Sequence, residues 1–196
     1  MYRLATCQIE KNMATIRDAT FCFLTNHTEF VAQKRRISKQ FWNNKLCGNN
    51  FEHSSLKSAK GIGENITLFA VVRHPIDRFL SGYADKCHRE LFYYTAEERC
   101  FGCKYDMRCF VEKLFRTLVG YYTNTIEKTR MINYYVRHFA PQIWYCDFGE
   151  HKNDYILINY HTGPNGTRRI ADDFDEVYKQ AQVPASLRAN IHSEML

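Results

Sequence analysis

The sequence predicts an α/β domain with a mainly parallel sheet flanked by helices. Two strand-loop-helix units lead to this prediction, one over Leu4–Leu24 and the other over Leu68–Tyr83. A short apolar run followed by helical periodicity is typical of a buried parallel strand and its crossover helix. The chain has 196 residues, 45% of them hydrophobic and 15% aromatic, which is enough for one substantial core. We therefore expect a single domain over residues 1–196.

The first unit consists of a strand at Leu4–Ile9, a loop at Glu10–Ala14 and a helix from Thr15 to about Leu24. Lys11 supplies an ammonium group, Thr15 a hydroxyl, and the helix start several backbone N–H groups, so together they can bind an anion. The alternative is a surface lysine followed by an N-cap threonine. No Gly-x-x-x-x-Gly-Lys-[Ser/Thr] pattern occurs, which argues against an ordinary P-loop NTPase.

The second unit begins with a Val-rich strand that ends at Arg73, and Pro75 then marks a helix start. Helical spacing predicts one apolar stripe on this helix, formed by Ile76, Phe79, Leu80 and Tyr83. Ser81 lies away from that stripe, and Arg73 lies at the carboxyl end of the strand, where open α/β sheets bind ligands. An arginine and a serine hydroxyl beside a helix N-terminus form a candidate phosphate site.

The pattern Val-Arg-x-Pro-x-x-Arg-Phe-x-Ser-Gly-Tyr in this unit closely resembles the 3′-phosphate-binding motif of the Golgi carbohydrate sulfotransferases. Those enzymes use 3′-phosphoadenosine 5′-phosphosulfate (PAPS) as donor. The resemblance implies that Arg73 and Ser81 bind the 3′-phosphate, and that the fold is similar to that of the nucleotide kinases.

The first unit matches the family's 5′-phosphosulfate pattern, Lys-x-x-[Ser/Ala/Cys]-Thr, with the residues Lys11, Asn12, Met13, Ala14 and Thr15. The resemblance implies that these residues bind the phosphosulfate and that Lys11 is also catalytic, because its ammonium would stabilise charge on the bridging oxygen. Glu10 departs from the family, in which a proline or glutamine is commoner. Its carboxylate would repel the donor unless it points away or pairs with a cation.

Sulfotransferases of this kind use a His or Glu base, which in some members precedes the 3′-phosphate strand. His27, Glu52 and His53 are the candidates here, and we expect His53 to be the catalytic base, the alternative being an exposed loop histidine. A basic stretch with two aromatic residues has two interpretations. It could be an acceptor surface for acidic sugars, or, as is more common for such patterns, a solvated helix face with a tryptophan in the core. Its residues are Lys34, Arg35, Arg36, Lys39, Phe41 and Trp42.

Eight cysteines and the sequons at Asn26, Asn65 and Asn165 favour an oxidising, luminal compartment. Four cysteines lie in or beside a Cys-rich insertion at about residues 85–105: Cys87, Cys100, Cys103 and Cys109. A zinc site is one interpretation, with His88 as a further ligand. We expect two disulfides instead, because the other luminal signals agree with them and related sulfotransferases need no metal. Cysteine order alone leaves the connectivity open.

Later segments predict ordinary packing. Asp106 is expected to cap a helix that ends at Gly120 and places these side chains in the core: Met107, Phe110, Val111, Leu114, Phe115 and Leu118. The segment from His138 to Cys146 resembles the family's His-aromatic-x-Pro-Gln…Cys segment, in which His138 contacts a substrate or is structural. A late strand is expected at Asp154–Tyr160 and a surface helix at Ala171–Gln182.

The formal charge of +6 suits anionic partners without naming one, and nothing supports nucleic acid. No apolar run is long enough to span a bilayer, and Met1–Cys7 lacks the features of a signal peptide. The resemblance implies a Golgi-luminal enzyme held by an N-terminal type II membrane anchor that this sequence lacks, so we expect it to be incomplete at both ends.

The resemblance as a whole predicts transfer of a sulfonate group from PAPS to a hydroxyl of a glycan or proteoglycan such as a glycosaminoglycan, without a metal. The alternatives are an inactive family member that binds an anionic glycan and a zinc-binding interaction module.

Overall fold

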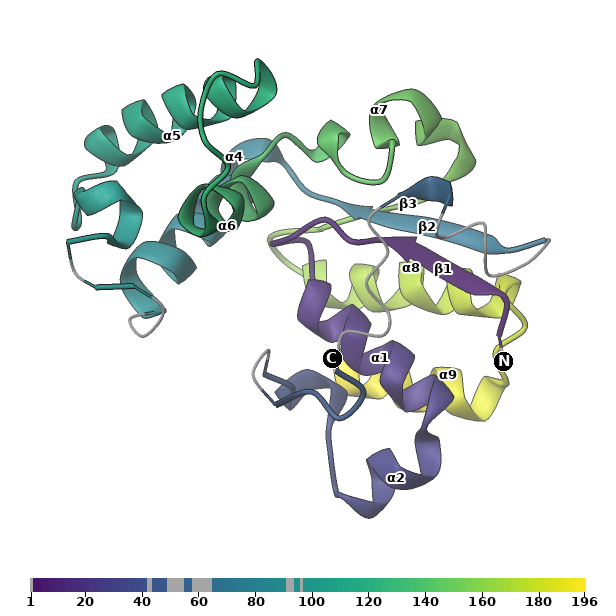
Figure 1. Cartoon of the computed structure of the whole chain (residues 1–196). Helices are drawn as coiled ribbons and strands as arrows, with labels where there is room; N and C mark the ends of the chain where they lie inside the picture. Colours follow the sequence, from purple (N-terminus) through teal and green to yellow (C-terminus); the bar gives the residue numbers. More distant parts are fainter. Residues whose placement is uncertain (1, 42–43, 49–54, 58–64, 91–93, 96) are drawn as a thin grey trace. The chain divides into compact units, whose positions relative to one another are not determined.

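The chain forms two compact units, Met1–Arg73 with Gln142–Leu196, and His74–Pro141. The computed structural model describes residues 2–41, 44–48, 55–57, 65–90, 94–95 and 97–196 (Figure 1). Each unit has buried apolar clusters of its own. The single domain expected from the sequence stays a prediction.

The first unit contains a parallel sheet of three strands in the order β1 (Leu4–Cys7), β2 (Thr67–Val72) and β3 (Ile156–Asn159). Cys7 pairs with Ala70, and Val72 pairs with Asn159, so the strands end near one common edge. This sheet, flanked by helices, confirms the predicted α/β class and its three strands, with ends that differ by a few residues.

Side chains alternate between the two faces of the sheet, and both faces are covered. Phe69, Val71 and Ile158 belong to a core cluster with residues of α1 (Ala14–Thr25), α8 (Gly166–Gln180) and α9 (Ala185–Met195). Leu68 and Ala70 belong to a second cluster, which includes Phe148 of α7 (Phe148–His151). Figure 1 shows α1, α8 and α9 on one face of the sheet and α7 on the other.

Shorter elements complete the first unit: α2 (His27–Ala32), η1 (Ile37–Lys39), η5 (Gln142–Trp144) and η6 (Lys152–Asp154). The predicted surface helix at Ala171–Gln182 is α8, which begins earlier, at Gly166. It lies at the surface with one side buried: Glu176 and Lys179 are exposed, whereas Phe174 and Tyr178 are each 1% exposed and pack edge-on against Phe69.

The second unit is helical, with α4 (Pro75–Tyr83), the π-helix η3 (Ala84–Arg89), the 3₁₀ turn η4 (Arg99–Gly102), α5 (Met107–Tyr122) and α6 (Arg130–Phe139). Its core is built from aromatic rings. Phe110 contacts Phe79, Tyr135 and Phe139, with ring centroids 5.2–6.2 Å apart, a separation typical of favourable aromatic pairs.

The apolar stripe expected on α4 is only partly buried. Ile76 and Leu80 are 61% and 43% exposed, so their predicted core position is wrong. The helix instead turns its Arg78 side inward, where the Arg78 guanidinium donates to the Ala140 carbonyl over 2.7 Å. Gly82 lies so close to Phe139 that an added Cβ would be 2.7 Å from the ring. These two contacts, which periodicity cannot reveal, set the rotation of the helix.

Asp106 caps α5 as predicted, since its carboxylate accepts from the Cys109 N–H over 3.0 Å. Two other expectations for this helix are wrong. Met107, Val111 and Phe115 are exposed rather than buried. Gly120 does not end the helix, which continues to Tyr122. The lack of a side chain at Gly120 lets Ile126 pack closely, because a Cβ at this position would be 2.7 Å from the Ile126 Cγ2.

All eight cysteines are paired in disulfides. Within the Cys-rich segment the pairs are Cys87–Cys100 and Cys103–Cys109, which confirms the expected oxidation in pairs. The first unit contains Cys7–Cys146 and Cys22–Cys47. Among the described residues, no helix has the length and apolar character needed to cross a membrane.

We expect peptide mapping of the unreduced protein to recover these four linked pairs. Disulfide-bonded sulfurs are not thiolates, and zinc is bound by thiolates, so the same preparation should contain no stoichiometric zinc by elemental analysis. Free thiols at Cys87, Cys100, Cys103 and Cys109 together with one zinc per chain would contradict the pairing.

Candidate functional site

The candidate site lies at the edge of the first unit's sheet where its three parallel strands end. The segment Gln8–Met13 follows β1, Arg73 follows β2, and Tyr160 follows β3. The Tyr160 N–H donates to the Val72 carbonyl over 2.7 Å, which extends the pairing of β2 with β3 by one step. Ligands of open parallel sheets bind at this edge.

The backbone between β1 and α1 is strained. Lys11 and Met13 have positive φ angles, 67° and 61°, whereas Asn12 between them does not. Left-handed residues other than glycine are uncommon and cost about 1–3 kcal/mol each. Successive backbone N–H groups in a turn that contains left-handed residues can form a concave anion-binding surface. The strain therefore occurs where the sequence predicts an anion site.

The start of α1 adds further donors. Met13 is the N-cap residue, no side chain caps the helix, and its first turn contains no acidic residue. The first helical bond runs from the Arg17 N–H to the Met13 carbonyl, so the N–H groups of Ala14, Thr15 and Ile16 have no partner within the helix. With the positive end of the helix dipole, these groups favour an anion. The Thr15 side chain is half-buried in this first turn.

The Asn12 side chain links this loop to β2, the central strand of the sheet. Asn12 is 3% exposed, and its Nδ2 donates to the Val71 carbonyl over 2.8 Å and to Gln142 Oε1 over 2.6 Å. The amide nitrogen is thus used within the protein, whereas the buried Oδ1 has no partner among the described residues.

Gln142 fixes the backbone of Arg73 from both sides. Its Nε2 donates to the Arg73 carbonyl over 2.8 Å, and its Oε1 accepts from the Arg73 N–H over 3.1 Å. The same Oε1 accepts from Asn12. We call these three residues, Asn12, Arg73 and Gln142, the amide junction. It joins segments that lie far apart in the sequence.

The Arg73 side chain extends from this junction. Its guanidinium lies over the Tyr160 ring, 4.1 Å from the centroid, and its Nη1 donates to the Lys11 carbonyl over 3.4 Å. Its Nε is buried and has no hydrogen-bond partner among the described residues. A buried guanidinium N–H without an acceptor is costly, so this atom points to an anionic ligand.

Glu10 is buried in the same region, 6% exposed, and accepts from Gln8 Nε2 over 2.9 Å. The carboxylate therefore has a donor on one side, and the cationic Lys11 follows it in sequence. This arrangement partly offsets the repulsion that a buried carboxylate exerts on an anion.

The segment after Gln142 is held in place by the Cys7–Cys146 disulfide, which ties it to the end of β1. Tyr155 adds to this restraint, because its hydroxyl donates to the Cys146 carbonyl over 2.9 Å. Burial, with the carboxylates of Asp147 and Asp154, raises the pKa of Tyr155 to about 12. The hydroxyl therefore keeps its proton at physiological pH.

The body of α1 is anchored by a buried charged cluster. Asp18, 5% exposed, pairs with Arg17 and with Lys45, whose Nζ is 2.5 Å from Asp18 Oδ2. The nearby Cys22–Cys47 disulfide joins the same two segments. These contacts fix the body of the helix behind its first turn.

Ser81 lies on α4 in the second unit, where it is half-buried. His53, the predicted base, and its neighbour Glu52 lie outside the described residues, as does Trp42. His27 contacts Phe23 edge-on, with ring centroids 4.6 Å apart. His138 Nδ1 is 2.7 Å from the Tyr134 carbonyl one helical turn earlier, which favours its structural interpretation.

The basic stretch, for which the sequence left open an acceptor surface or a solvated helix face, forms contacts within the first unit. Arg35 hydrogen-bonds to Gln33, Gln40 and Asn44, and Arg36 forms an ion pair with Glu194 over 3.1 Å. Phe41 is 70% exposed. These partners favour the solvated-surface interpretation of the basic stretch.

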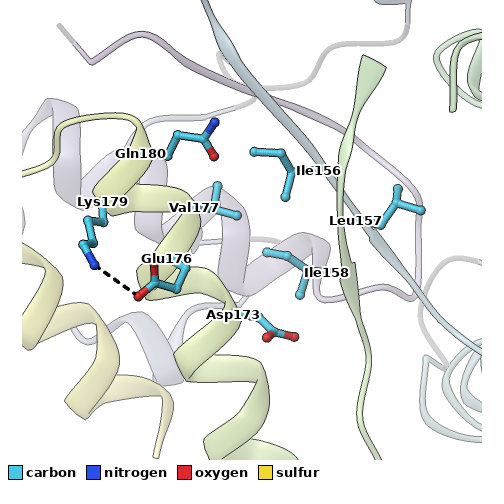
Figure 2. Close-up of a pocket in the computed structure, with 8 residues that line it drawn as sticks. All are labelled: Ile156, Leu157, Ile158, Asp173, Glu176, Val177, Lys179 and Gln180. Carbon is cyan, nitrogen blue, oxygen red and sulfur yellow. Dashed lines mark hydrogen bonds and ion pairs between the residues drawn. The ribbon is translucent and has the colours of Figure 1, made fainter. Parts of the chain in front are cut away.

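A separate cleft of about 360 Å³ lies between β3 and α8. Figure 2 shows Ile156 and Ile158 of the strand on one side, with Glu176 paired to Lys179 on the helix. Its lining includes none of the residues of the amide junction or of the start of α1. The cleft is therefore distinct from the candidate site.

Two contributors to the site were not predicted. Gln142 lies within the His138–Cys146 segment that resembles the family, but the sequence suggested a role only for His138 in that segment. Tyr160 ends the predicted third strand, and the rule that parallel strands end at one edge would have placed it beside Arg73.

The fold and the site define an α/β protein with a candidate anion-binding edge where the three parallel strands of its sheet end. The chain matches the family model described as "Sulfotransferase family" over residues 1–194, and it belongs to that family. It is similar to the carbohydrate sulfotransferase chst-1 of Caenorhabditis elegans, with 29% identity over 94% of this chain and 56% of the relative. A second protein of that organism, vep-2, named only provisionally as a sulfotransferase, is 29% identical over 100% of this chain and 60% of the relative.

The chain thus spans little more than half the length of these relatives. No solved structure matches it significantly.

Replacing Gln142 tests the amide junction. Gln142→Ala leaves the Arg73 N–H, the Arg73 carbonyl and one Asn12 donor without their partner, and an unsatisfied buried polar group costs about 1–3 kcal/mol. We expect denaturant unfolding to show a loss of at least about 2 kcal/mol. The matched control is Gln180→Ala on the exposed side of α8, which should change the unfolding free energy by less than about 0.5 kcal/mol. Equal effects of the two changes would contradict the role of Gln142.

Proposed function

We propose that this chain transfers a sulfonate group from PAPS to a hydroxyl of a glycan. Membership of the sulfotransferase family and the similarity to a carbohydrate sulfotransferase support the reaction class. The observation that carries the proposal is the strained start of α1, which no side chain caps, at the carboxyl edge of the sheet beside a guanidinium with an unpartnered buried nitrogen.

The start of α1 is the proposed phosphosulfate site. The backbone N–H groups of residues 14–16 and the Thr15 hydroxyl supply hydrogen bonds to the phosphate oxygens, while Lys11 supplies the charge. Met13 and Ala14 contribute backbone only. Asn12 acts by holding the loop through the amide junction, which is how it supports donor binding in this proposal.

The 3′-phosphate is proposed to bind Arg73 and Ser81, as the sequence motif implies. Support within the first unit comes from Arg73. Its guanidinium is oriented by the Tyr160 ring and by the Lys11 carbonyl, so little side-chain freedom remains to be lost on binding. Recognition of this phosphate would distinguish PAPS from nucleotides that lack it.

In the proposed reaction the acceptor oxygen forms a bond to sulfur while the bond from sulfur to the bridging phosphate oxygen breaks. Negative charge grows on that phosphate oxygen, where the Lys11 ammonium and the N–H groups of α1 stabilise it. A base takes the proton of the acceptor hydroxyl. We keep His53 as the proposed base, with Glu52 and His27 as the other candidates. None of these steps requires a metal.

Transfer to glycans or proteoglycans would take place in the Golgi lumen, with the chain held at the membrane by an anchor that precedes it. Four disulfides fit an oxidising compartment. Asn26, Asn65 and Asn165, the sequon asparagines, are all exposed, as glycan attachment requires. No nucleic-acid partner is proposed.

Lys11→Ala should lower turnover by about 10²–10³, because loss of one such electrostatic donor removes transition-state stabilisation. The affinity for PAPS should change less than the rate. Initial-rate measurements with labelled PAPS and a panel of glycans test this expectation, with Lys179→Ala on α8 as the control. A Lys11→Ala variant with unchanged turnover would remove Lys11 from the reaction.

The 3′-phosphate assignment concerns binding and can be tested without turnover. Arg73→Ala should weaken adenosine 3′,5′-bisphosphate by more than Ser81→Ala does, since charge-assisted hydrogen bonds contribute about 1.5–3 kcal/mol. Both variants should leave 5′-AMP nearly unaffected in calorimetry, and Arg168→Ala should affect neither ligand. Equal losses for the two nucleotides would contradict a 3′-specific role. Tight binding of the bisphosphate without any transfer would favour the inactive, glycan-binding alternative.

His53→Ala should abolish transfer and leave the affinity for adenosine 3′,5′-bisphosphate intact, because a base contacts the acceptor rather than the donor. The wild-type rate should rise with pH through a group titrating near about 6.5, since only the neutral imidazole accepts a proton. If His53→Ala stays active, Glu52→Gln and His27→Ala become the decisive variants.

A further inference from the structure

A histidine–carboxylate contact holds the residue that follows Tyr160. His161 Nε2 lies 3.1 Å from Asp173 Oδ2, which joins the loop after β3 to the middle of α8. An ionised carboxylate only accepts hydrogen bonds, so the histidine Nε2 is the donor. Gly166, the first residue of α8, packs against the His161 backbone, because a Cβ there would be 2.8 Å from the His161 carbonyl oxygen. His161 is thus held both at its ring and at its backbone.

Tyr160 is the residue through which this contact reaches the candidate site. On one side its N–H is fixed by the Val72 carbonyl. On the other side the backbone has left β3, which ends at Asn159, and the contacts of His161 hold it there. The Tyr160 ring packs against the core cluster of the first unit and lies beneath the Arg73 guanidinium, 4.1 Å from its centroid. The position of the guanidinium therefore depends on how firmly the backbone of Tyr160 is held.

Two neighbouring aspartates of α8 hold different parts of the first unit. Asp173 and Ile158 line the same cleft, and Ile158 comes two residues before Tyr160, so this aspartate lies alongside the end of β3 (Figure 2). Asp172 makes the same kind of contact with His192 on α9, where its Oδ1 is 2.7 Å from the histidine Nε2. Both aspartates are partly exposed, 42% and 56% at the side chain. Only the first of these two contacts leads to the residue next to Tyr160.

We propose that Asp173, acting through His161, positions Tyr160 beneath Arg73 and thereby strengthens binding of the 3′-phosphate. This inference rests on the role in 3′-phosphate binding proposed above for Arg73. Asp173 and His161 are positioning residues in this arrangement, because the contact with the guanidinium is made by Tyr160. A guanidinium that is oriented beforehand loses little side-chain freedom when an anion binds, so its support raises affinity without touching the ligand.

Calorimetry on the full chain with adenosine 3′,5′-bisphosphate and 5′-AMP tests this inference. Asp173→Ala and His161→Ala should each weaken the bisphosphate about threefold to fivefold, the scale of a partly exposed charged pair. Both variants should leave the affinity for 5′-AMP unchanged. Asp172→Ala is the matched control, because it removes an equivalent histidine contact from the neighbouring residue of α8, and it should change neither affinity. Circular dichroism should show that all three variants keep the helical content of the wild type.

A double-mutant cycle separates positioning of Arg73 from a general loosening of the fold. In the Arg73→Ala background, Asp173→Ala should cause no further loss of bisphosphate affinity, because the group that it positions is gone. A merely structural effect would weaken binding equally in both backgrounds. Tyr160→Leu removes the ring beneath the guanidinium, so in this background too Asp173→Ala should have no further effect.

Several results would overturn the inference. Equal losses for the two nucleotides, or a loss in Asp172→Ala as large as that in Asp173→Ala, would show a structural effect. An undiminished effect of Asp173→Ala in the Arg73→Ala background would exclude positioning of the guanidinium. Wild-type affinity in Asp173→Ala, with bisphosphate affinity reduced in Arg73→Ala, would exclude this inference alone and leave the 3′-phosphate site. Wild-type bisphosphate affinity in Arg73→Ala would exclude the 3′-phosphate site, and the inference with it.

Discussion

The amide junction of Asn12, Arg73 and Gln142 is the constraint on which the candidate site depends. Where β2 ends, the N–H and carbonyl of Arg73 leave the ladder, and buried backbone groups must find partners. One glutamine side chain satisfies both groups and also accepts from Asn12, which in turn donates to Val71. Three segments distant in sequence are thereby fixed to one another, so the protein itself holds the groups of the proposed anion site in position.

This arrangement explains how the loop before α1 keeps an unfavourable backbone. Left-handed conformations at Lys11 and Met13 cost free energy that the surrounding contacts must offset. Asn12, between them, is held by two hydrogen bonds, and α1 is anchored by the Asp18 cluster and the Cys22–Cys47 disulfide. The loop thus stays strained because both of its ends are fixed.

Sequence reasoning predicted what depends on local pattern. The two strand-loop-helix units, the third strand, the Asp106 cap and the oxidised cysteines all follow from apolar runs, capping chemistry and composition. Sequence reasoning failed where the same local pattern is compatible with more than one packing arrangement and only tertiary contacts decide between them. Helical spacing marks apolar positions on α5, but only packing decides that Phe110 is buried and Phe115 exposed. The role of Gln142 likewise depends on which backbone groups it meets after folding. The choice of His53 rested on chain position alone and stays a prediction.

The division of the chain into units has a consequence for the order of events during synthesis. The second unit is one uninterrupted segment, and its disulfides join cysteines separated by only 13 and 6 residues. It can therefore fold as soon as it leaves the ribosome, as contiguous units generally do. β1, although made first, must wait for Cys146, 139 residues later, and for β3 beyond it before the first unit is complete. The earliest residues of the site are thus among the last to reach their final positions.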